Sequence, residues 1–539
     1  MNHTVMIYDT TLRDGNQAEG VSLSLNDKLH IAARLDEIGV HFIEGGWPNP
    51  TNPKDVAFFK RVGELGLKHA RVSAFGSTRR AGNSPQSDPI LRTLLDAETE
   101  VIAIFGKSWD FHAERVLRVS LDENLEMIRS SVEYLASQGR EVVYDAEHYF
   151  DGYLRNPDYA LRTLKAAEEG GARWLVLCDT NGGTLPHEAE RVMRETVGRI
   201  STPWGIHTHN DCGCAVATSM LAAHLGATQI QGTINGYGER CGNANLCTII
   251  PNLVLKMHAE SLTEEAVRRL SDLSRYVSEL AITVHDERQP YVGGCAFAHK
   301  GGAHIDAVRK APASFEHVPP ESVGNERRVL LSDQSGGSTI VEKLQTVYPE
   351  LDKKHPAVGR LLERVKHLEH EGYQFEAAEG SFRLLAEEIV ERRDPAFTLE
   401  RYRVLTELRE GGEPHAEATI KVRVGDQVHH TAAEGVGPVD ALAKALRKAI
   451  TSFYPRLSSI RLTDYKVRVL DGAAGTATKV RVLIETTDGR TEWGTVGVSS
   501  DVIEASWRAL ADSIEYGLRI AQANGELEAP PPPSGEGRG

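Results

Sequence analysis

Two histidines, His207 and His209, close a short apolar segment that begins at Trp204. In an extended strand the side chains alternate between two faces, so both imidazoles point the same way. Two imidazoles on one face can share a metal ion, although such a pair also arises by accident in ordinary strands. The context favours a metal site, because a glycine-rich loop at 236–242 leads to Asn243 and lets the backbone approach a ligand closely.

Asp14, which follows the first apolar segment of the chain, is the candidate third ligand. Together with His207 and His209 it would give a divalent cation one carboxylate and two imidazoles, and Asn243 could add a neutral oxygen. A cation so held acts as a Lewis acid on a substrate carbonyl. The neighbouring Arg13 keeps its charge at any physiological pH, so it either stabilises an oxyanion on that carbonyl or forms a structural salt bridge.

Candidates for proton transfer and substrate binding come from three further segments. Glu147 ends the fifth apolar segment, and His304 lies in a glycine-rich stretch far downstream. A carboxylate combined with an imidazole suits proton abstraction from carbon beside a carbonyl, although a histidine in a glycine-rich loop is often incidental. Thr180 ends the sixth segment, where its hydroxyl either binds a substrate carboxylate or caps the following turn.

Short apolar segments that alternate with helical stretches must position these residues. Helices are expected at 26–38, 122–138, 157–169 and 214–225. Eight strand and helix units within about 260 residues predict a (β/α)8 TIM barrel, in which the polar residues at the strand ends converge on one face. The expected strands are Val5–Tyr8, His41–Glu44, Ala70–Ala74, Val101–Phe105, Glu141–Tyr144, Trp174–Cys178, Trp204–His207 and Gln229–Ile234.

The chain changes character beyond the barrel. Helical patterns without strands predict a linker region, and alternating strands followed by helices predict a duplicated C-terminal α+β domain. A proline-rich and glycine-rich end has too little apolar content to fold. The resulting division is a barrel at 1–258, a helical linker at 259–394, an α+β regulatory domain at 395–522 and a disordered tail at 523–539.

Composition limits the classes of protein. The 539 residues are 40% hydrophobic and 25% charged, which is typical of a soluble globular protein. A net charge of −15 disfavours nucleic acids and anionic membranes as partners. The sequence has no apolar run of about 20 residues and no signal peptide, so we expect a cytoplasmic protein. Six cysteines without a Cys-x-x-Cys pair predict no disulfide framework.

Four segments together resemble a family of metal-dependent acyl-CoA condensing enzymes. The family includes the 2-isopropylmalate, homocitrate and citramalate synthases, with 3-hydroxy-3-methylglutaryl-CoA lyase as a relative. Segments such as Glu44-Gly-Gly-Trp-Pro48 and Leu177-Cys-Asp-Thr-Asn-Gly182 are similar to the long form of the (R)-citramalate synthases. The four segments are Asp9-Thr-Thr-Leu-Arg-Asp-Gly15, His207-Thr-His-Asn-Asp211, Asn235-Gly-Tyr-Gly-Glu-Arg-Cys-Gly-Asn243 and His299-Lys-Gly-Gly-Ala-His304.

This resemblance implies a reaction and roles for the candidate residues. Acetyl-CoA would condense with pyruvate to give (R)-citramalate and CoA, on a route to isoleucine. The divalent metal, Mg²⁺, Mn²⁺ or Zn²⁺, would be bound by Asp14, His207 and His209. Arg13 and Thr180 would hold the 2-oxo acid, and proton transfer would use Glu147 and His304.

The resemblance also implies a homodimer and feedback inhibition by isoleucine. The same residues are also compatible with two related enzymes. A 2-isopropylmalate synthase differs only in the size of the acceptor pocket, whereas a retro-Claisen lyase would lack the C-terminal domain. A catalytically inactive barrel that binds amino acids is disfavoured, because the candidate catalytic residues are all present.

Overall fold

The computed structural model describes residues 4–331, 336–407, 415–470 and 478–526. The chain divides into two compact units, Met1–Phe297 with Glu316–Arg327 and Ala298–Phe315 with Arg328–Gly539. The first unit holds the predicted barrel, and the second holds the helical segment and the two α+β repeats.

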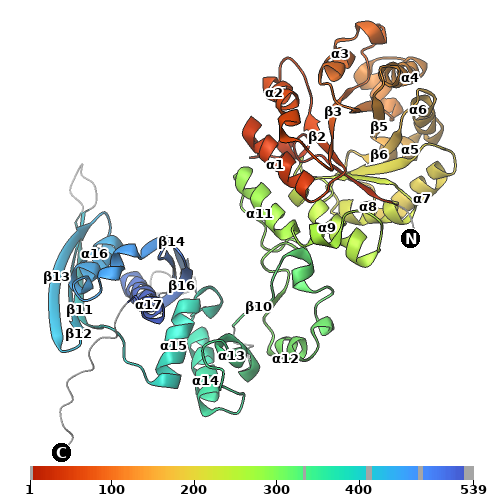
Figure 1. Cartoon of the computed structure of the whole chain (residues 1–539). Helices are drawn as coiled ribbons and strands as arrows, with labels where there is room; N and C mark the ends of the chain where they lie inside the picture. The colour runs from red at the N-terminus through yellow and green to blue at the C-terminus, as the bar shows by residue number, and fades with distance from the viewer. Residues whose placement is uncertain (1–3, 332–335, 408–414, 471–477, 527–539) are drawn as a thin grey trace, which may run out of the picture. The chain divides into compact units, whose positions relative to one another are not determined.

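Eight parallel strands close into a barrel in chain order, which confirms the predicted fold (Figure 1). Each strand lies within a few residues of its predicted position, because a barrel strand is buried on both faces and therefore forms a continuous apolar run. The strands are β1 (Met6–Asp9), β2 (Phe42–Gly46), β3 (Arg71–Ser77), β4 (Val101–Lys107), β5 (Glu141–Glu147), β6 (Trp174–Asp179), β7 (Trp204–Thr208) and β8 (Gln229–Gly232).

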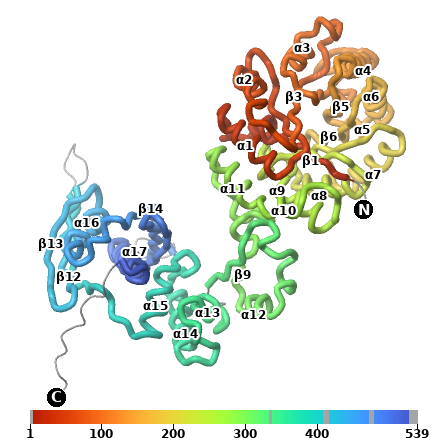
Figure 2. Tube along the Cα trace, in the orientation of Figure 1, coloured from red at the N-terminus to blue at the C-terminus, as the bar shows by residue number. Residues whose placement is uncertain are grey.

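Helices surround the strands, as the trace in Figure 2 shows. The first begins at a capping box, in which the Ser24 side chain accepts a hydrogen bond from Asp27 N and the Asp27 carboxylate accepts one from Ser24 N. The helices of the barrel are α1 (Leu25–Glu37), α2 (Pro53–Val62), α3 (Pro89–Asp96), α4 (Leu121–Ser137), α5 (Tyr149–Arg155), α6 (Pro157–Glu169), α7 (Pro186–Val197) and α8 (Ala215–His224).

Three more helices complete the first unit: α9 (Leu246–Pro251), α10 (Glu264–Val267) and α11 (Leu270–Leu280). The second unit begins with α12 (Gly302–Lys310), α13 (Gly337–Leu344), α14 (Pro356–His370) and α15 (Glu379–Glu391), in the region expected to be a helical linker. The glycine-rich stretch that ends at His304 was expected to be a loop, but residues 302–304 begin α12. The second unit also contains a parallel pair of two-residue strands, β9 (Ala298–His299) and β10 (Arg328–Val329), which the sequence did not predict.

The C-terminal part is a duplicated α+β unit, as predicted. One antiparallel sheet contains β11 (Thr398–Glu407), β12 (His415–Val424) and β13 (Gln427–Gly435), and α16 (Pro438–Ile450) packs on it. The other sheet contains β14 (Arg461–Val469), β15 (Val480–Thr487) and β16 (Glu492–Ser499), with α17 (Val502–Ala523). Strands β11 and β13 were missed, because most of their side chains are exposed and their apolar alternation is weak.

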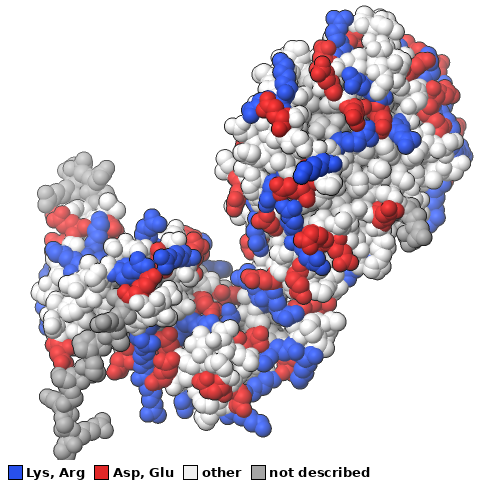
Figure 3. Space-filling model, viewed as in Figure 1, with Lys and Arg blue, Asp and Glu red and all other residues white. Residues whose placement is uncertain are grey.

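The predicted disordered tail lies, from residue 527 onward, outside the described residues. Among the helices that are described, none combines the length and apolar character needed to span a bilayer. On the face of the barrel unit seen in Figure 3, basic and acidic side chains are intermixed.

One carboxylate organises the connection into β3. Asp36, near the end of α1, accepts hydrogen bonds of 2.7 to 3.0 Å from the backbone N–H groups of Lys68, His69 and Ala70. Burial alone would raise the pKa of Asp36, but these bonds outweigh it and lower the pKa. Replacement of Asp36 by Ala should therefore lower the free energy of unfolding by about 1–3 kcal/mol, because the donors lose their acceptor.

Urea denaturation of the wild type and Asp36→Ala at several pH values measures this loss. The folded pKa lies below the unfolded value of about 3.9, so the contribution is complete above that value and is lost as the pH falls through the folded pKa. Glu37→Ala, at the exposed neighbouring position, is the control and should cost at most about 1 kcal/mol. Equal stability of Asp36→Ala and the wild type at pH 7 would contradict the assignment.

Candidate active site

Three buried side chains converge at the carboxyl end of the barrel strands. Asp14 follows β1, His207 lies on β7, and His209 follows β7 directly. Asp14 Oδ2 lies 3.3 Å from His207 Nε2 and 3.8 Å from His209 Nε2, and the two Nε2 atoms are 3.4 Å apart. These atoms form a group that could hold a metal ion.

Two side chains on β5 and β8 orient His207. Its Nδ1 atom is 2.9 Å from Gln231 Oε1, and Gln231 Nε2 donates a hydrogen bond of 3.1 Å to Asp145 Oδ1. Because Gln231 uses Nε2 as a donor, its Oε1 is the acceptor that holds the proton on His207 Nδ1. The Nε2 lone pair is then free for a cation. Gln231 was not among the predicted site residues, because its type and position alone indicate no role.

Asn243 is joined to His209 by a backbone bridge. Its Nδ2 donates to Tyr237 O at 3.2 Å, whereas its buried Oδ1 and Nδ1 of His209 have no hydrogen-bond partner among the described residues. Gly238, at φ 157°, allows this arrangement, since a Cβ atom there would overlap the Asn243 amide. The unpartnered Asn243 oxygen and the converging Asp14, His207 and His209 atoms are a donor set that fits a divalent cation.

The electrostatics of the cluster keep Asp14 and His209 in the forms that bind a cation. At His207 burial acts to lower the pKa, but Asp14 outweighs it and raises the pKa. Burial acts to raise the pKa of Asp14, but the Arg13 guanidinium and His207 hold it well below its usual range. Burial, and then the neighbouring His207, lower the pKa of His209 to about 4. Above that pH His209 is therefore neutral, which is the form that binds metals.

Arg13 is fixed between two carboxylates and an aromatic ring. Its Nε donates to Glu44 Oε1 at 2.5 Å, its Nη1 lies 3.4 Å from Asp14 Oδ2, and its guanidinium carbon is 3.8 Å from the centre of the Phe75 ring. Burial alone would lower the pKa of Arg13, but Glu44 and Asp14 more than offset it and raise the pKa. Glu44 also accepts a hydrogen bond from Tyr8 at 2.8 Å. The sequence assigned no role to Glu44 or Tyr8.

Glu147 and Thr180 line one cavity, whose volume is about 430 Å³, together with Arg13, Asp14, His207 and His209. The Glu147 carboxylate forms an ion pair with Lys107. The Thr180 hydroxyl accepts a hydrogen bond of 2.8 Å from His148 N, so it ties β6 to the end of β5. Both residues therefore line the site, with one polar atom of each already engaged.

His304 belongs to the second unit. It lies on α12, and its ring stacks on Phe315 with the ring centres 4.2 Å apart. The structure thus brings the other predicted residues together in the barrel unit, whereas His304 is placed only within its own unit.

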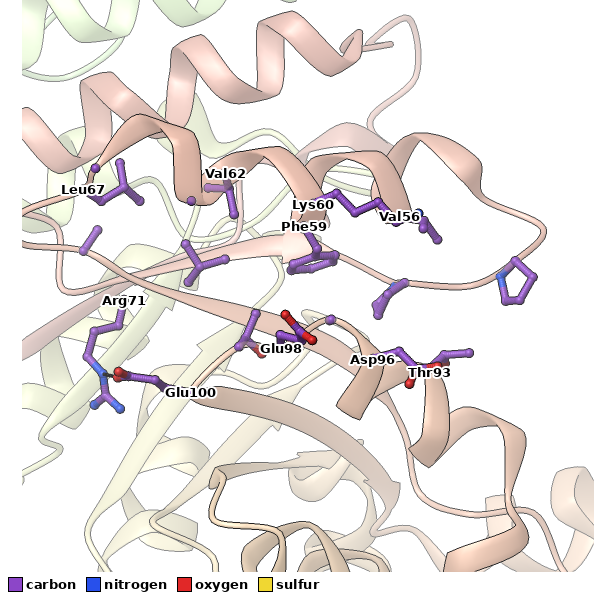
Figure 4. Close-up of a pocket in the computed structure, with 18 residues that line it drawn as sticks. Val56, Phe59, Lys60, Val62, Leu67, Arg71, Thr93, Asp96, Glu98 and Glu100 are labelled. Carbon is purple, nitrogen blue, oxygen red and sulfur yellow. Dashed lines mark hydrogen bonds and ion pairs between the residues drawn. The ribbon is translucent and has the colours of Figure 1, made fainter.

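A larger cavity, of about 910 Å³, lies on the outer wall of the barrel between α2 and α3 (Figure 4). Val56, Phe59 and Val62 of α2 line one side, and Arg71 pairs with Glu100 at one end. None of the predicted site residues lines it. The chemistry therefore belongs to the smaller cavity at the strand ends.

Comparison with known families identifies three regions of the chain. Residues 4–277 match the HMGL-like family, residues 291–372 the homocitrate synthase post-HMGL domain, and residues 376–518 the LeuA allosteric (dimerisation) domain. The chain therefore belongs to the HMGL-like family of barrel proteins.

Individual relatives show to which group within this family the chain belongs. The chain is 54% identical to the (R)-citramalate synthase of Geobacter sulfurreducens, over 96% of this chain and 98% of that protein. It is 51% identical to that of Synechocystis sp., over 96% of each chain. Identity to the 2-isopropylmalate synthase of Methanocaldococcus jannaschii is 30%, over 95% of this chain and 94% of that protein. Within the HMGL-like family, the chain is a member of the (R)-citramalate synthase group.

Loss of the Gln231 contact should weaken metal binding. Gln231→Leu removes the acceptor of His207 Nδ1, and we expect the affinity for Mn²⁺ to fall by about 10 to 100-fold. His209→Ala should abolish binding while the barrel stays folded. Calorimetric titration of Mn²⁺ into each variant, with circular dichroism to monitor folding, measures both effects.

Gln229→Leu is the matched control, because Gln229 lies two residues away on β8 and is also buried, but contacts Gln231 rather than a histidine. Its Mn²⁺ affinity should stay within about threefold of the wild type. Wild-type affinity in Gln231→Leu would show that the glutamine does not orient His207.

Proposed function

We propose that this protein catalyses the metal-dependent condensation of acetyl-CoA with pyruvate and the hydrolysis of the product to (R)-citramalate and CoA. The observation that carries the proposal is the full-length identity of 54% to an (R)-citramalate synthase. The cluster of Asp14, His207 and His209 beside Arg13 in one cavity supplies the groups that the reaction needs. The product would serve isoleucine biosynthesis through 2-oxobutanoate.

The acceptor would bind between the ligand cluster and Arg13. Asp14, His207, His209 and the Asn243 oxygen would hold Mg²⁺, Mn²⁺ or Zn²⁺, which when bound supplies Lewis-acid activation of a carbonyl. Arg13 carries a fixed positive charge and would offset the negative charge that develops on the ketone oxygen. Thr180, on the same cavity wall, would contact the acceptor carboxylate.

Proton transfer is assigned to Glu147 and His304. Glu147 would remove a proton from the acetyl methyl group, the resulting carbanion would attack the ketone carbon of pyruvate, and water would then hydrolyse the thioester. Lys107 places a positive charge beside the Glu147 carboxylate and holds it in the cavity. The part of His304 in this transfer rests on the resemblance of the His299 to His304 segment alone.

The alternatives are less well supported. A 2-isopropylmalate synthase, which would use 2-oxoisovalerate for leucine biosynthesis, corresponds to the lower identity of 30%. A retro-Claisen lyase would not need the C-terminal region that matches the LeuA allosteric (dimerisation) domain.

Release of CoA thiol from acetyl-CoA tests the proposal directly. The purified protein should release thiol with pyruvate at least about tenfold faster than with 2-oxobutanoate, 2-oxoisovalerate or 2-oxoglutarate in the presence of Mg²⁺ or Mn²⁺. Excess EDTA should abolish the release. A preference for 2-oxoisovalerate would favour the leucine pathway, and no release with any acceptor would contradict a synthase.

The C-terminal region is assigned to assembly and regulation. Because residues 376–518 match the LeuA allosteric (dimerisation) domain, we infer a homodimer whose two βββα repeats respond to isoleucine.

Isoleucine should therefore inhibit thiol release. We expect millimolar isoleucine to reduce the rate with pyruvate at least several-fold, and leucine at the same concentration to have a smaller effect. Initial rates over a series of effector concentrations measure this. Inhibition by leucine alone, or by neither amino acid, would contradict isoleucine as the effector.

A further inference from the structure

The connection from β2 to α2 contributes Trp47 to the wall of the acceptor cavity. The pairing of β2 with β3 shifts register between Glu44 and Gly46, and such irregularities redirect the chain next to active sites. A Cβ atom on Gly45 would overlap the Phe58 ring, and one on Gly46 would overlap the Asp55 carboxylate. The segment after β2 is thus pressed tightly against α2.

A buried ion pair between α1 and α2 holds this segment in place. Lys28 of α1 is fully buried, and its Nζ forms an ion pair with Asp55 of α2 and donates to Gly45 O at 3.0 Å. The other Asp55 oxygen accepts hydrogen bonds from Trp47 N at 3.0 Å and Asn52 Nδ2 at 2.8 Å. The two charges therefore fix the backbone on both sides of Gly46.

A buried ion pair is expensive, because each ion loses its hydration and a well-packed apolar pair is often as stable. Burial accordingly lowers the pKa of Lys28, although the neighbouring Asp55 acts to raise it. Most of the Asp55 hydrogen bonds go to the segment that carries Trp47 rather than to the core. The pair is thus best explained by the position that it gives to Trp47.

Trp47 lies against two aromatic rings of the cavity wall. Its indole meets Phe75 edge-on at 6.0 Å between ring centres and Phe105 at 5.9 Å, and those two rings stack on each other at 5.5 Å. Phe75 in turn lies under the Arg13 guanidinium. All three rings and Arg13 line the cavity of about 430 Å³. Trp47 is therefore a bulky wall that approaches the acceptor position from the β2 side.

We propose that Trp47, held in place by the buried pair of Lys28 and Asp55, is a specificity-determining residue that limits the acceptor to 2-oxo acids with a side chain as small as a methyl group. Lys28 is a positioning residue, which acts through Asp55 and the backbone of Trp47. This inference rests on the proposed condensation, since it concerns the acceptor of that reaction.

If Trp47 limits the size of the acceptor, its replacement should change the relative use of two acceptors that differ in size. In Trp47→Leu, the ratio of kcat/KM for pyruvate to that for 2-oxobutanoate should fall by about tenfold or more, which is the discrimination typical of one methylene in an apolar pocket. The change should appear mainly as a lower KM for the larger acid, whereas the KM for acetyl-CoA should stay within about twofold. Thiol release by the full-length protein with each acceptor gives these constants.

Trp109→Leu is the matched control. Trp109 lies on the same rim of the barrel after β4 and is partly exposed like Trp47, but it does not line the cavity. Trp109→Leu removes the same side-chain volume as Trp47→Leu, so a general effect on stability would appear in both variants. Its acceptor ratio should remain that of the wild type.

The ion pair is tested by a cycle with Lys28→Met. This variant should lower the acceptor ratio, as Trp47→Leu does. The double variant should show no further fall, because both changes act through the Trp47 side chain. If Lys28→Met does not fold, Asn52→Ala removes one hydrogen bond to Asp55 and should give a smaller shift of the same sign. A folded Lys28→Met with the wild-type ratio would overturn the role of the pair.

Different results would overturn the role of Trp47 and the proposed condensation. If Trp47→Leu keeps the acceptor ratio of the wild type, and the wild-type enzyme uses pyruvate, Trp47 does not determine specificity. Failure of the wild-type enzyme itself to release thiol with pyruvate would overturn the proposed condensation instead.

Discussion

Arg13 and the carboxylates around it are the interaction on which the rest of the site depends. Glu44 and Asp14 both contact its guanidinium, so the end of β1 is joined to the end of β2 below the cavity. Burial raises the pKa values of nearby Asp9 and Asp145 to about 7, and Glu44 adds to the effect at both. The guanidinium of Arg13 offsets part of the cost of burying these acids, because it places a permanent positive charge beside Glu44 and Asp14.

The fold, and the convergence of most candidate residues on one face of the barrel, followed from the sequence. Barrel strands are buried on both faces, so their apolar runs identified all eight. Once the barrel was predicted, parallel topology required the polar residues after the strands to meet on one face. The two-residue spacing of His207 and His209 placed both rings on one side of β7, where Asp14 lies opposite them.

The remaining contacts depend on packing that a sequence does not display. Lys28 occupies a helix in which a lysine normally faces solvent, and its burial follows from the way α1, α2 and the end of β2 meet. Gln231 is one polar residue in a short strand, and its role exists only because His207 lies on the neighbouring strand. Strands β9 and β10 are two residues long, which is too short for any periodic pattern.

The buried ion pair of Lys28 and Asp55 should hold the Trp47 segment more firmly on heating than exposed hydrogen bonds would. The hydration of charged groups becomes less favourable as temperature rises, so the cost of keeping Lys28 and Asp55 dry declines on heating. Loops held only by a few exposed hydrogen bonds loosen over the same range. The segment that carries Trp47 should therefore be among the last parts of the barrel rim to change shape as the protein warms. The acceptor cavity should keep its size over the same range.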